Sequence, residues 1–305
     1  MTREKESQQS IVDSYSDKIR SRAAGPFPVL PLGSTLRTMA NIEKHLPGEF
    51  CWIELATTDQ AATKEFYRQV FGWTFKDAPI GPNDFYTTFQ LQGRDAAAAC
   101  ILRPEQTSRG IPSHWNLYIA VESADATAAQ ATRLGGTVLA PPFDVFDAGR
   151  MAVIQDPTGA TFSLWQAKKN PGIGITGLDG TLCWADLNTP DRARAGQFYS
   201  DLFGWQIMKE DEDSAHNYWH IKNGEEFIGG IPPCEHQPAG VPAHWLAYFF
   251  VSDCDATSAK AKELGAKLFM PPTDFEDVGR ISVIGDPQGA TFAIFKAAAR
   301  RAGAS

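Results

Sequence analysis

The sequence has no excess of positive charge, since 28 lysine and arginine residues stand against 36 aspartate and glutamate residues. Nucleic acids and anionic membranes attract proteins through basic fields, so we expect neither as a partner. There is no long apolar run, and no apolar segment of a secretory leader follows the charged N-terminus. The five cysteines form no C-x-x-C pair and predict reduced thiols. These absences predict a cytoplasmic protein.

What the chain does contain is a long internal duplication. Cys51-Trp52 recurs as Cys183-Trp184, an offset of 183 − 51 = 132 residues. The F-Y and F-G-W motifs within residues 66–73 recur later at the same offset, and the D-P-x-G-A-T-F segment of residues 156–162 recurs at 286–292. A repeat of this length indicates two homologous domains rather than a solenoid.

Within each repeat, one order of elements occurs twice. Residues 50–56 alternate like a strand, and a helix with its N-cap at Asp59 ends at Gly72. Short strands follow, and a new strand near 114–121 begins the same order again. Each repeat is thus two βαβββ units. The predicted divisions are an extended or partly disordered arm at 1–49, domains at 50–167 and 181–297, a glycine-rich flexible linker at 168–180 and a tail at 298–305.

Paired βαβββ units with these motifs resemble the vicinal oxygen chelate superfamily, which includes glyoxalases, bleomycin resistance proteins and extradiol dioxygenases. The resemblance implies an α+β fold in which each domain is a half-open, eight-stranded barrel. It also implies a divalent metal held by three side chains on the first strand of each unit and on the last strand of the second unit. The matching positions are Trp52, Asn116 and Ser163 in the first domain and Trp184, Leu246 and Ala293 in the second. His, Cys and carboxylate donors are missing there, so we expect no cofactor.

Two acidic residues are the main candidates for chemistry. Side chains two apart on a strand share a face, which places Glu54 beside Trp52 and Asp186 beside Trp184. A carboxyl group on an aromatic face is a candidate general acid or base, although accepting structural hydrogen bonds is an equally simple role. The other residues expected on these faces are His114, Asn116, Tyr118 and Trp165 in the first domain and His220, His244 and Tyr248 in the second.

Two further hypotheses concern a histidine set and an arginine. Asp186, His220 and His244, if they converge, make an acid/base group or an unusual site for Fe, Mn, Zn or Ni. Arg280 follows Gly279 as Arg150 follows Gly149, and either clamps an anionic substrate or forms a structural ion pair.

The leading interpretation is a small-molecule enzyme that acts on an aromatic or polycyclic metabolite by metal-independent acid/base chemistry, as an isomerase, cyclase or lyase. Asp186 or Glu54 serves as the base, with His220 or His244 as its proton partner. Sequestration of an aromatic compound without chemistry is the first alternative. A metal-dependent dioxygenase or glyoxalase with a non-standard ligand set is the second. Either a monomer or a homodimer is compatible with two domains in one chain.

Overall fold

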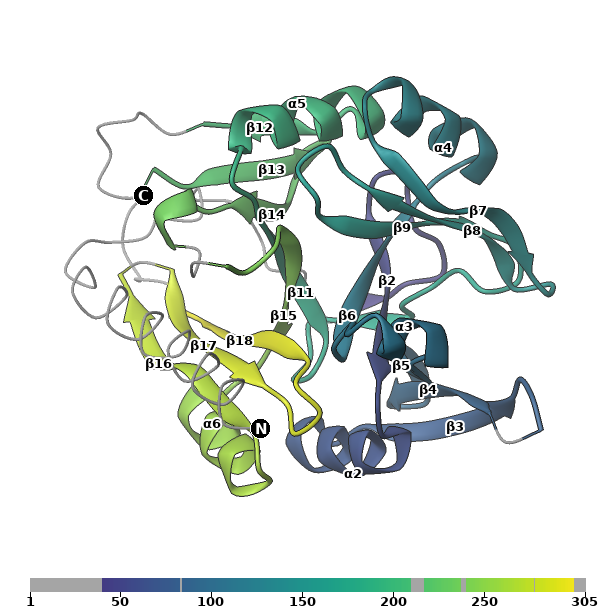
Figure 1. Cartoon of the computed structure of the whole chain (residues 1–305). Helices are drawn as coiled ribbons and strands as arrows, with labels where there is room; N and C mark the ends of the chain where they lie inside the picture. Colours follow the sequence, from purple (N-terminus) through teal and green to yellow (C-terminus); the bar gives the residue numbers. More distant parts are fainter. Residues whose placement is uncertain (1–39, 83, 210–216, 237–239, 277, 299–305) are drawn as a thin grey trace.

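Two eight-stranded mixed sheets, one from each repeat, make up most of the protein (Figure 1). The computed structural model describes residues 40–82, 84–209, 217–236, 240–276 and 278–298. Most of the predicted N-terminal arm and nearly all of the predicted tail lie outside these residues.

The first sheet has the order β3-β4-β5-β2-β6-β9-β8-β7. Its strands are β2 (Phe50–Thr57), β3 (Thr74–Pro79), β4 (Phe85–Leu91), β5 (Arg94–Ile101), β6 (His114–Ala120), β7 (Thr137–Val145), β8 (Gly149–Gln155) and β9 (Thr161–Ala167). The two βαβββ units meet at the antiparallel pair of β2 and β6. Since the edge strands β3 and β7 do not pair with each other, the sheet stays open on one side.

The second sheet repeats this topology in the order β12-β13-β14-β11-β15-β18-β17-β16. Its strands are β11 (Leu182–Asn188), β12 (Gln206–Met208), β13 (Trp219–Asn223), β14 (Glu226–Ile231), β15 (His244–Phe250), β16 (Lys267–Phe275), β17 (Gly279–Gly285) and β18 (Thr291–Ala297). The α+β fold class with two tandem eight-stranded domains is therefore confirmed.

Equivalent helices begin and end on equivalent residues. The helices are α2 (Gln60–Phe71), α3 (Pro104–Ser108), α4 (Ala124–Arg133), α5 (Arg192–Phe203) and α6 (Cys254–Glu263), with a 3-10 turn η1 at Cys234–His236. Asp59 caps α2 by accepting a hydrogen bond from the Ala62 amide, as its sequence position predicts. Gly72 ends α2 with a φ of 69°, a left-handed conformation that favours glycine.

The segment between the domains is tied to the first sheet, so the flexible connector expected from its glycines is wrong. Strand β10 (Ile175–Thr176) pairs with β1 (Ala40–Asn41). The Ile173 amide donates to the Cys51 carbonyl at 2.7 Å. Gly172 has a φ of +112°, and a Cβ there would collide with that same carbonyl.

The repeated motifs join the two domains to each other. Tyr67 on α2 donates to Asp286 of the second domain at 3.1 Å, and Tyr199 on α5 donates to Asp156 of the first domain at 3.1 Å. The other carboxylate oxygen of Asp156 accepts backbone amides of its own turn, including that of Gly159. The aspartate of each D-P-x-G turn thus accepts hydrogen bonds from its own turn and from a tyrosine of the opposite domain.

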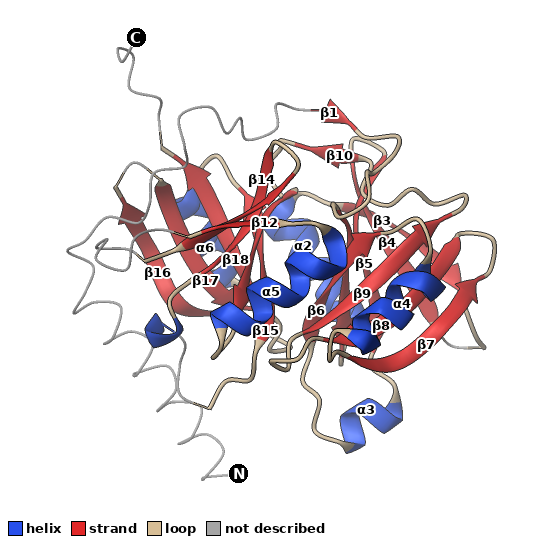
Figure 2. Cartoon of the chain, turned by 90° about the horizontal axis from the view of Figure 1, so that it is seen from above, coloured by secondary structure: helices blue, strands red, loops and turns tan. Residues whose placement is uncertain are grey.

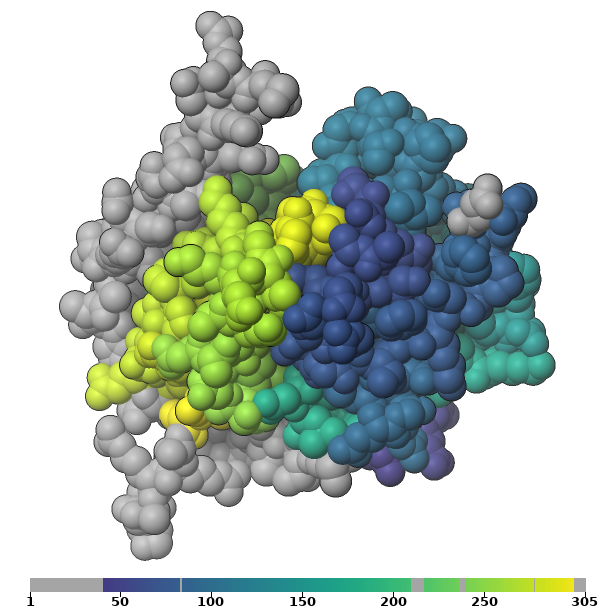
Figure 3. Space-filling model, turned by 90° about the horizontal axis from the view of Figure 1, so that it is seen from below, coloured from purple at the N-terminus to yellow at the C-terminus, as the bar shows by residue number. Residues whose placement is uncertain are grey.

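Aromatic side chains fill the space around these two contacts and form one core shared by both domains. The ring of Phe71 packs on Phe249 and Phe292 of the other domain, with centroids 5.1 and 5.8 Å apart. Helices α2 and α5 lie between the sheets in Figure 2, and α2 lies against α6 in Figure 3. Trp73 and Trp205 of the two F-G-W motifs are buried in this core, so these motifs are packing elements.

Candidate functional site

In each sheet, the face opposite the interdomain aromatic contacts carries the candidate residues, with the exception of Arg280. In the first sheet, Trp52 pairs with Tyr118, Glu54 pairs with Asn116, and Tyr118 pairs in turn with Ser163 on β9. Their neighbours of opposite parity, such as Leu55, point into the core. We call the side bearing Glu54 the first face and the corresponding side of the second sheet, bearing Asp186, the second face.

Glu54 is the centre of a hydrogen-bonded cluster on the first face. Its Oε1 accepts hydrogen bonds from the Tyr118 hydroxyl at 3.2 Å and from the Cys100 thiol at 3.6 Å. Tyr86 on β4 also hydrogen-bonds to the carboxyl group, and the Trp52 indole donates to the Tyr86 hydroxyl at 2.9 Å. The Glu54 side chain is half-buried, so solvent still reaches it.

Asp186 is the centre of the equivalent cluster on the second face. It accepts hydrogen bonds from the Tyr218 hydroxyl, from the Tyr248 hydroxyl at 2.7 Å and from the Trp184 indole at 3.0 Å. Trp184 also lies 3.0 Å from the Tyr218 hydroxyl. Unlike Glu54, Asp186 is buried, with 5% of its surface exposed.

Sequence reasoning placed neither Tyr86 nor Tyr218 among the site residues. Their spacing of 218 − 86 = 132 equals the repeat offset, so the duplication carried the signal. The repeat alone does not show that the hydroxyl group of Tyr86 or Tyr218 reaches the carboxyl group of Glu54 or Asp186. In the first sheet, β5 lies between β2 and β4 and pairs with both, so the contact of Tyr86 with Glu54 crosses an intervening strand.

Burial dominates the electrostatics of both acids. It raises the pKa of Glu54 and of Asp186 above their ordinary values, because a low-dielectric surrounding disfavours the ionised form. The tyrosine hydroxyls act in the opposite direction and offset part of this effect. A carboxyl group with a raised pKa holds its proton closer to neutral pH and so suits acid/base work.

The two faces differ in what surrounds the acid. Asn116 and Thr88 on the first face correspond to Leu246 and His220 on the second. The second face also carries a buried apolar cluster, separate from the shared core. Its members are Leu246, Met270, Phe275, Ile281, Val283, Ala293 and Phe295.

In the described part of the chain, Asp186, His220 and His244 do not form a group arranged to hold a metal, and their acid/base role stays a prediction. Asp186 and His220 are both in register with Gly230 on the strand between them, and a Cβ at Gly230 would collide with the Tyr218 hydroxyl. The Tyr218 side chain therefore lies between the two. The His244 ring nitrogen Nδ1 donates a hydrogen bond to the Pro242 carbonyl, 2.9 Å away, at the start of β15, where His244 pairs with Asn188.

The side chains at the superfamily's metal positions do not fit a divalent metal. These positions hold Trp52, Asn116 and Ser163, or Trp184, Leu246 and Ala293, which lack the usual nitrogen, sulfur and carboxylate donors. Within the described ranges there is also no group of three His, Cys, Asp or Glu side chains arranged to hold a metal.

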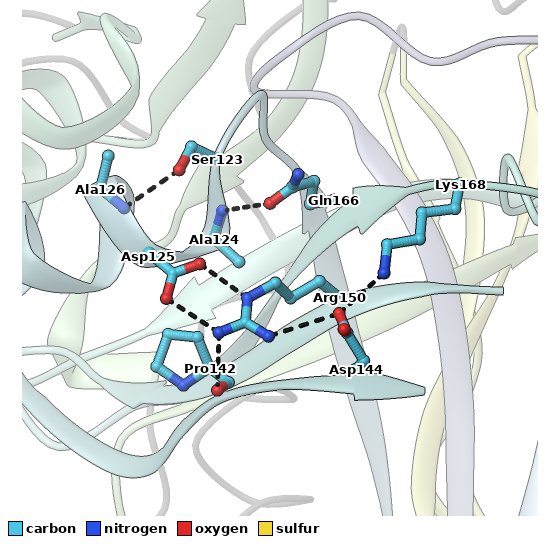
Figure 4. A network of polar contacts seen from close by, with 9 residues as sticks. All are labelled: Ser123, Ala124, Asp125, Ala126, Pro142, Asp144, Arg150, Gln166 and Lys168. Atoms are coloured by element: carbon cyan, nitrogen blue, oxygen red, sulfur yellow. Dashed lines mark hydrogen bonds and ion pairs between the residues drawn. The ribbon is translucent and has the colours of Figure 1, made fainter. Parts of the chain in front are cut away.

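Among the remaining candidates, Arg280 lies on the opposite side of its sheet from Asp186. It forms a bidentate pair with Asp255 on α6, at 2.7 and 2.8 Å, and a further ion pair with Asp274 at 2.8 Å. Arg150 makes the equivalent contacts with Asp125 and Asp144 (Figure 4). The ion-pair interpretation thus describes Arg280, and the expected substrate clamp is wrong.

Two other expected residues of the first face are anchored near its rim. The His114 ring nitrogen Nδ1 donates a hydrogen bond to the Pro112 carbonyl at 2.8 Å. The Trp165 indole donates to the Asn170 carbonyl at 3.0 Å, and its ring packs edge-on against Tyr118.

A family model described as "Glyoxalase/Bleomycin resistance protein/Dioxygenase superfamily" matches residues 50–164 and again residues 181–294. The chain belongs to this superfamily. A relative from Mycobacterium tuberculosis named "Putative glyoxylase CFP32" is 42% identical over 251 residues, which cover 81% of this chain and 94% of that protein. The anthracycline biosynthesis protein DnrV of Streptomyces peucetius is 34% identical over 266 residues, covering 81% of this chain and 93% of that protein.

Solved structures of the superfamily share the fold at low sequence identity. The Mn(II)-bound glyoxalase from Novosphingobium aromaticivorans matches with a TM-score of 0.57 and 15% identity, covering 82% of each chain. The 2,3-dioxygenase LapB from Pseudomonas sp. KL28 matches with a TM-score of 0.59 and 13% identity, covering 84% of this chain and 94% of that one. In the part of the chain that the structure describes, no helix is long and apolar enough to cross a membrane.

Proposed function

We propose that this chain is a small-molecule enzyme that moves protons on an aromatic or polycyclic metabolite, as an isomerase, cyclase or lyase. The observation that supports this most is the pair of equivalent clusters in which a carboxyl group with a raised pKa is flanked by two tyrosine hydroxyls. The names of the Streptomyces relatives support a polycyclic substrate, because they are anthracycline biosynthesis proteins.

The chemistry follows from the protonation states of the cluster. A neutral Glu54 carboxyl donates its proton to a substrate carbonyl oxygen, and the resulting carboxylate then takes the proton from the adjacent carbon, so that the ketone becomes its enol and the neutral carboxyl is restored. The Tyr118 hydroxyl, 3.2 Å from Glu54, stabilises the carboxylate between these steps. The metal positions do not fit a metal, so no step is assigned to one.

The test compares isosteric variants of the two acids. Purified wild-type, Glu54→Gln and Asp186→Asn proteins are incubated with a panel of anthracycline precursors, and the products are followed by chromatography and mass spectrometry. General acid/base catalysis contributes about a hundredfold or more, so we expect at least one variant to lose turnover on that scale while remaining folded. Undiminished turnover in both variants contradicts the proposal.

Sequestration of an aromatic compound is the second candidate, because Trp52 and Trp184 place indole groups beside the acids. A bound polycycle quenches tryptophan fluorescence in either case. Recovery of the ligand unchanged after prolonged incubation, with equal affinity in Glu54→Gln and Asp186→Asn, favours sequestration over catalysis.

A further inference from the structure

Asn116 presents an unengaged amide at the centre of the first face. It lies directly across from Glu54 in the pairing of β2 with β6, where side chains on one face come within about 5 Å. No hydrogen bond ties its side chain to the described part of the chain, and the residue is half-buried. A polar group on such a surface usually has a partner, so a free amide here is available to a ligand.

The second face offers no equivalent group. Leu246 occupies the position of Asn116, is 4% exposed and belongs to the buried apolar cluster of that face. Ile281 and Val283 are buried in the same cluster, whereas their first-face counterparts Met151 and Val153 are half-buried. A ligand entering the second face would have to displace packed side chains, and this costs the free energy of their burial.

We propose that the first domain alone holds the substrate. The Asn116 amide and the Glu54 carboxyl together bind the hydroxy-carbonyl edge of a flat polycyclic hydroxyquinone. The second face is structural. This rests on the proposed function and names its substrate class and its domain.

The hydrogen-bonding groups of Asn116 and Glu54 match this class of ligand. A primary amide donates and accepts hydrogen bonds, and a protonated carboxyl donates one, so the two together match a carbonyl oxygen beside a phenolic hydroxyl. Met151 and Val153 share the first face and supply apolar area, with the Trp165 ring beside Met151. Flat aromatic ligands bind well where apolar walls surround a few polar groups.

The test is the binding of 1,8-dihydroxyanthraquinone to the full chain, measured by tryptophan fluorescence quenching and by calorimetric stoichiometry. We expect one molecule per chain. Asn116→Leu, which gives the first face the residue of the second, is expected to weaken binding about tenfold, since it removes a hydrogen-bonding partner and leaves the ligand's polar atoms unpaired. Asn116→Asp, which is isosteric, keeps the acceptor but loses the donor and is also expected to weaken binding.

The matched control is Leu246→Met, a volume-conserving change at the equivalent position, which is expected to leave the dissociation constant within about twofold. Circular dichroism and the melting temperature establish that each variant is folded. Two molecules per chain, or unchanged binding in both Asn116 variants, overturns the proposal while leaving acid/base catalysis standing. Failure of the wild-type chain to bind the anthraquinone overturns the substrate class, whereas loss of turnover in Glu54→Gln tests the proposed function separately.

Discussion

His220 shows how one residue can change the character of a face that is otherwise duplicated. It replaces the Thr88 of the first repeat and lies among the rings of Trp184, Tyr218 and Phe227, with centroids 6.3, 5.0 and 5.5 Å away. This burial lowers its pKa from 6.5 to about 4, because the apolar rings disfavour the charged imidazolium. The structure therefore supports a neutral, packed histidine more than a proton partner for Asp186.

The lowered pKa of His220 predicts that the protein loses stability as the pH falls. Below pH 6.5 the unfolded chain takes up a proton at His220, but the folded chain does so only near its lowered pKa of about 4. Stability from this residue is thus lost as the pH falls from 6.5 toward 4. We expect His220→Phe, which keeps the ring contacts but does not titrate, to flatten this part of the curve in urea unfolding experiments. Parallel wild-type and variant curves over this range would contradict the assignment.

At the scale of elements, the sequence predicted most of what periodicity and capping determine. The helix that begins after Asp59 and ends at Gly72 lies where the apolar spacing places it. The strand predicted near residues 114–121 is one residue longer than the observed β6. Alternation predicted that Glu54 shares the face of Trp52, whereas the place of Asn116 on that face came from the resemblance to the superfamily. Contacts that depend on how strands pair at long range were missed, as for Tyr86, because no local pattern reports them.

The contact between α2 and the second domain gives a prediction at this scale. Tyr67→Phe removes the hydroxyl group that donates a hydrogen bond to Asp286 and leaves a buried carboxylate oxygen without that partner. We expect this to lower the free energy of unfolding by about 1–3 kcal/mol. Tyr199→Phe, which breaks the equivalent contact with Asp156, is the matched variant and is expected to cost a similar amount. Chemical denaturation with each variant measures both costs. A change near zero in either variant would show that the contact does not stabilise the interface.

For the whole molecule, the duplication produces two sheets but one continuous core. Phe71 and Trp73 of the first domain pack on Phe249 of the second, and Phe162 packs in the same way on Tyr199. Buried aromatic groups of this size contribute much of a domain's stability. Neither half therefore encloses its own apolar side chains, although each has a complete sheet.

This arrangement predicts that the two domains unfold together. In differential scanning calorimetry we expect a single transition whose van't Hoff enthalpy equals the calorimetric enthalpy, since opening either half exposes the core of the other. Tyr67→Phe is expected to shift that whole transition downward rather than to separate a new one, because Asp286 and Tyr67 belong to different domains. Two resolved transitions, with only one moved by Tyr67→Phe, would mean that each sheet is stable by itself. The interdomain contacts would then position the faces without determining whether the domains fold.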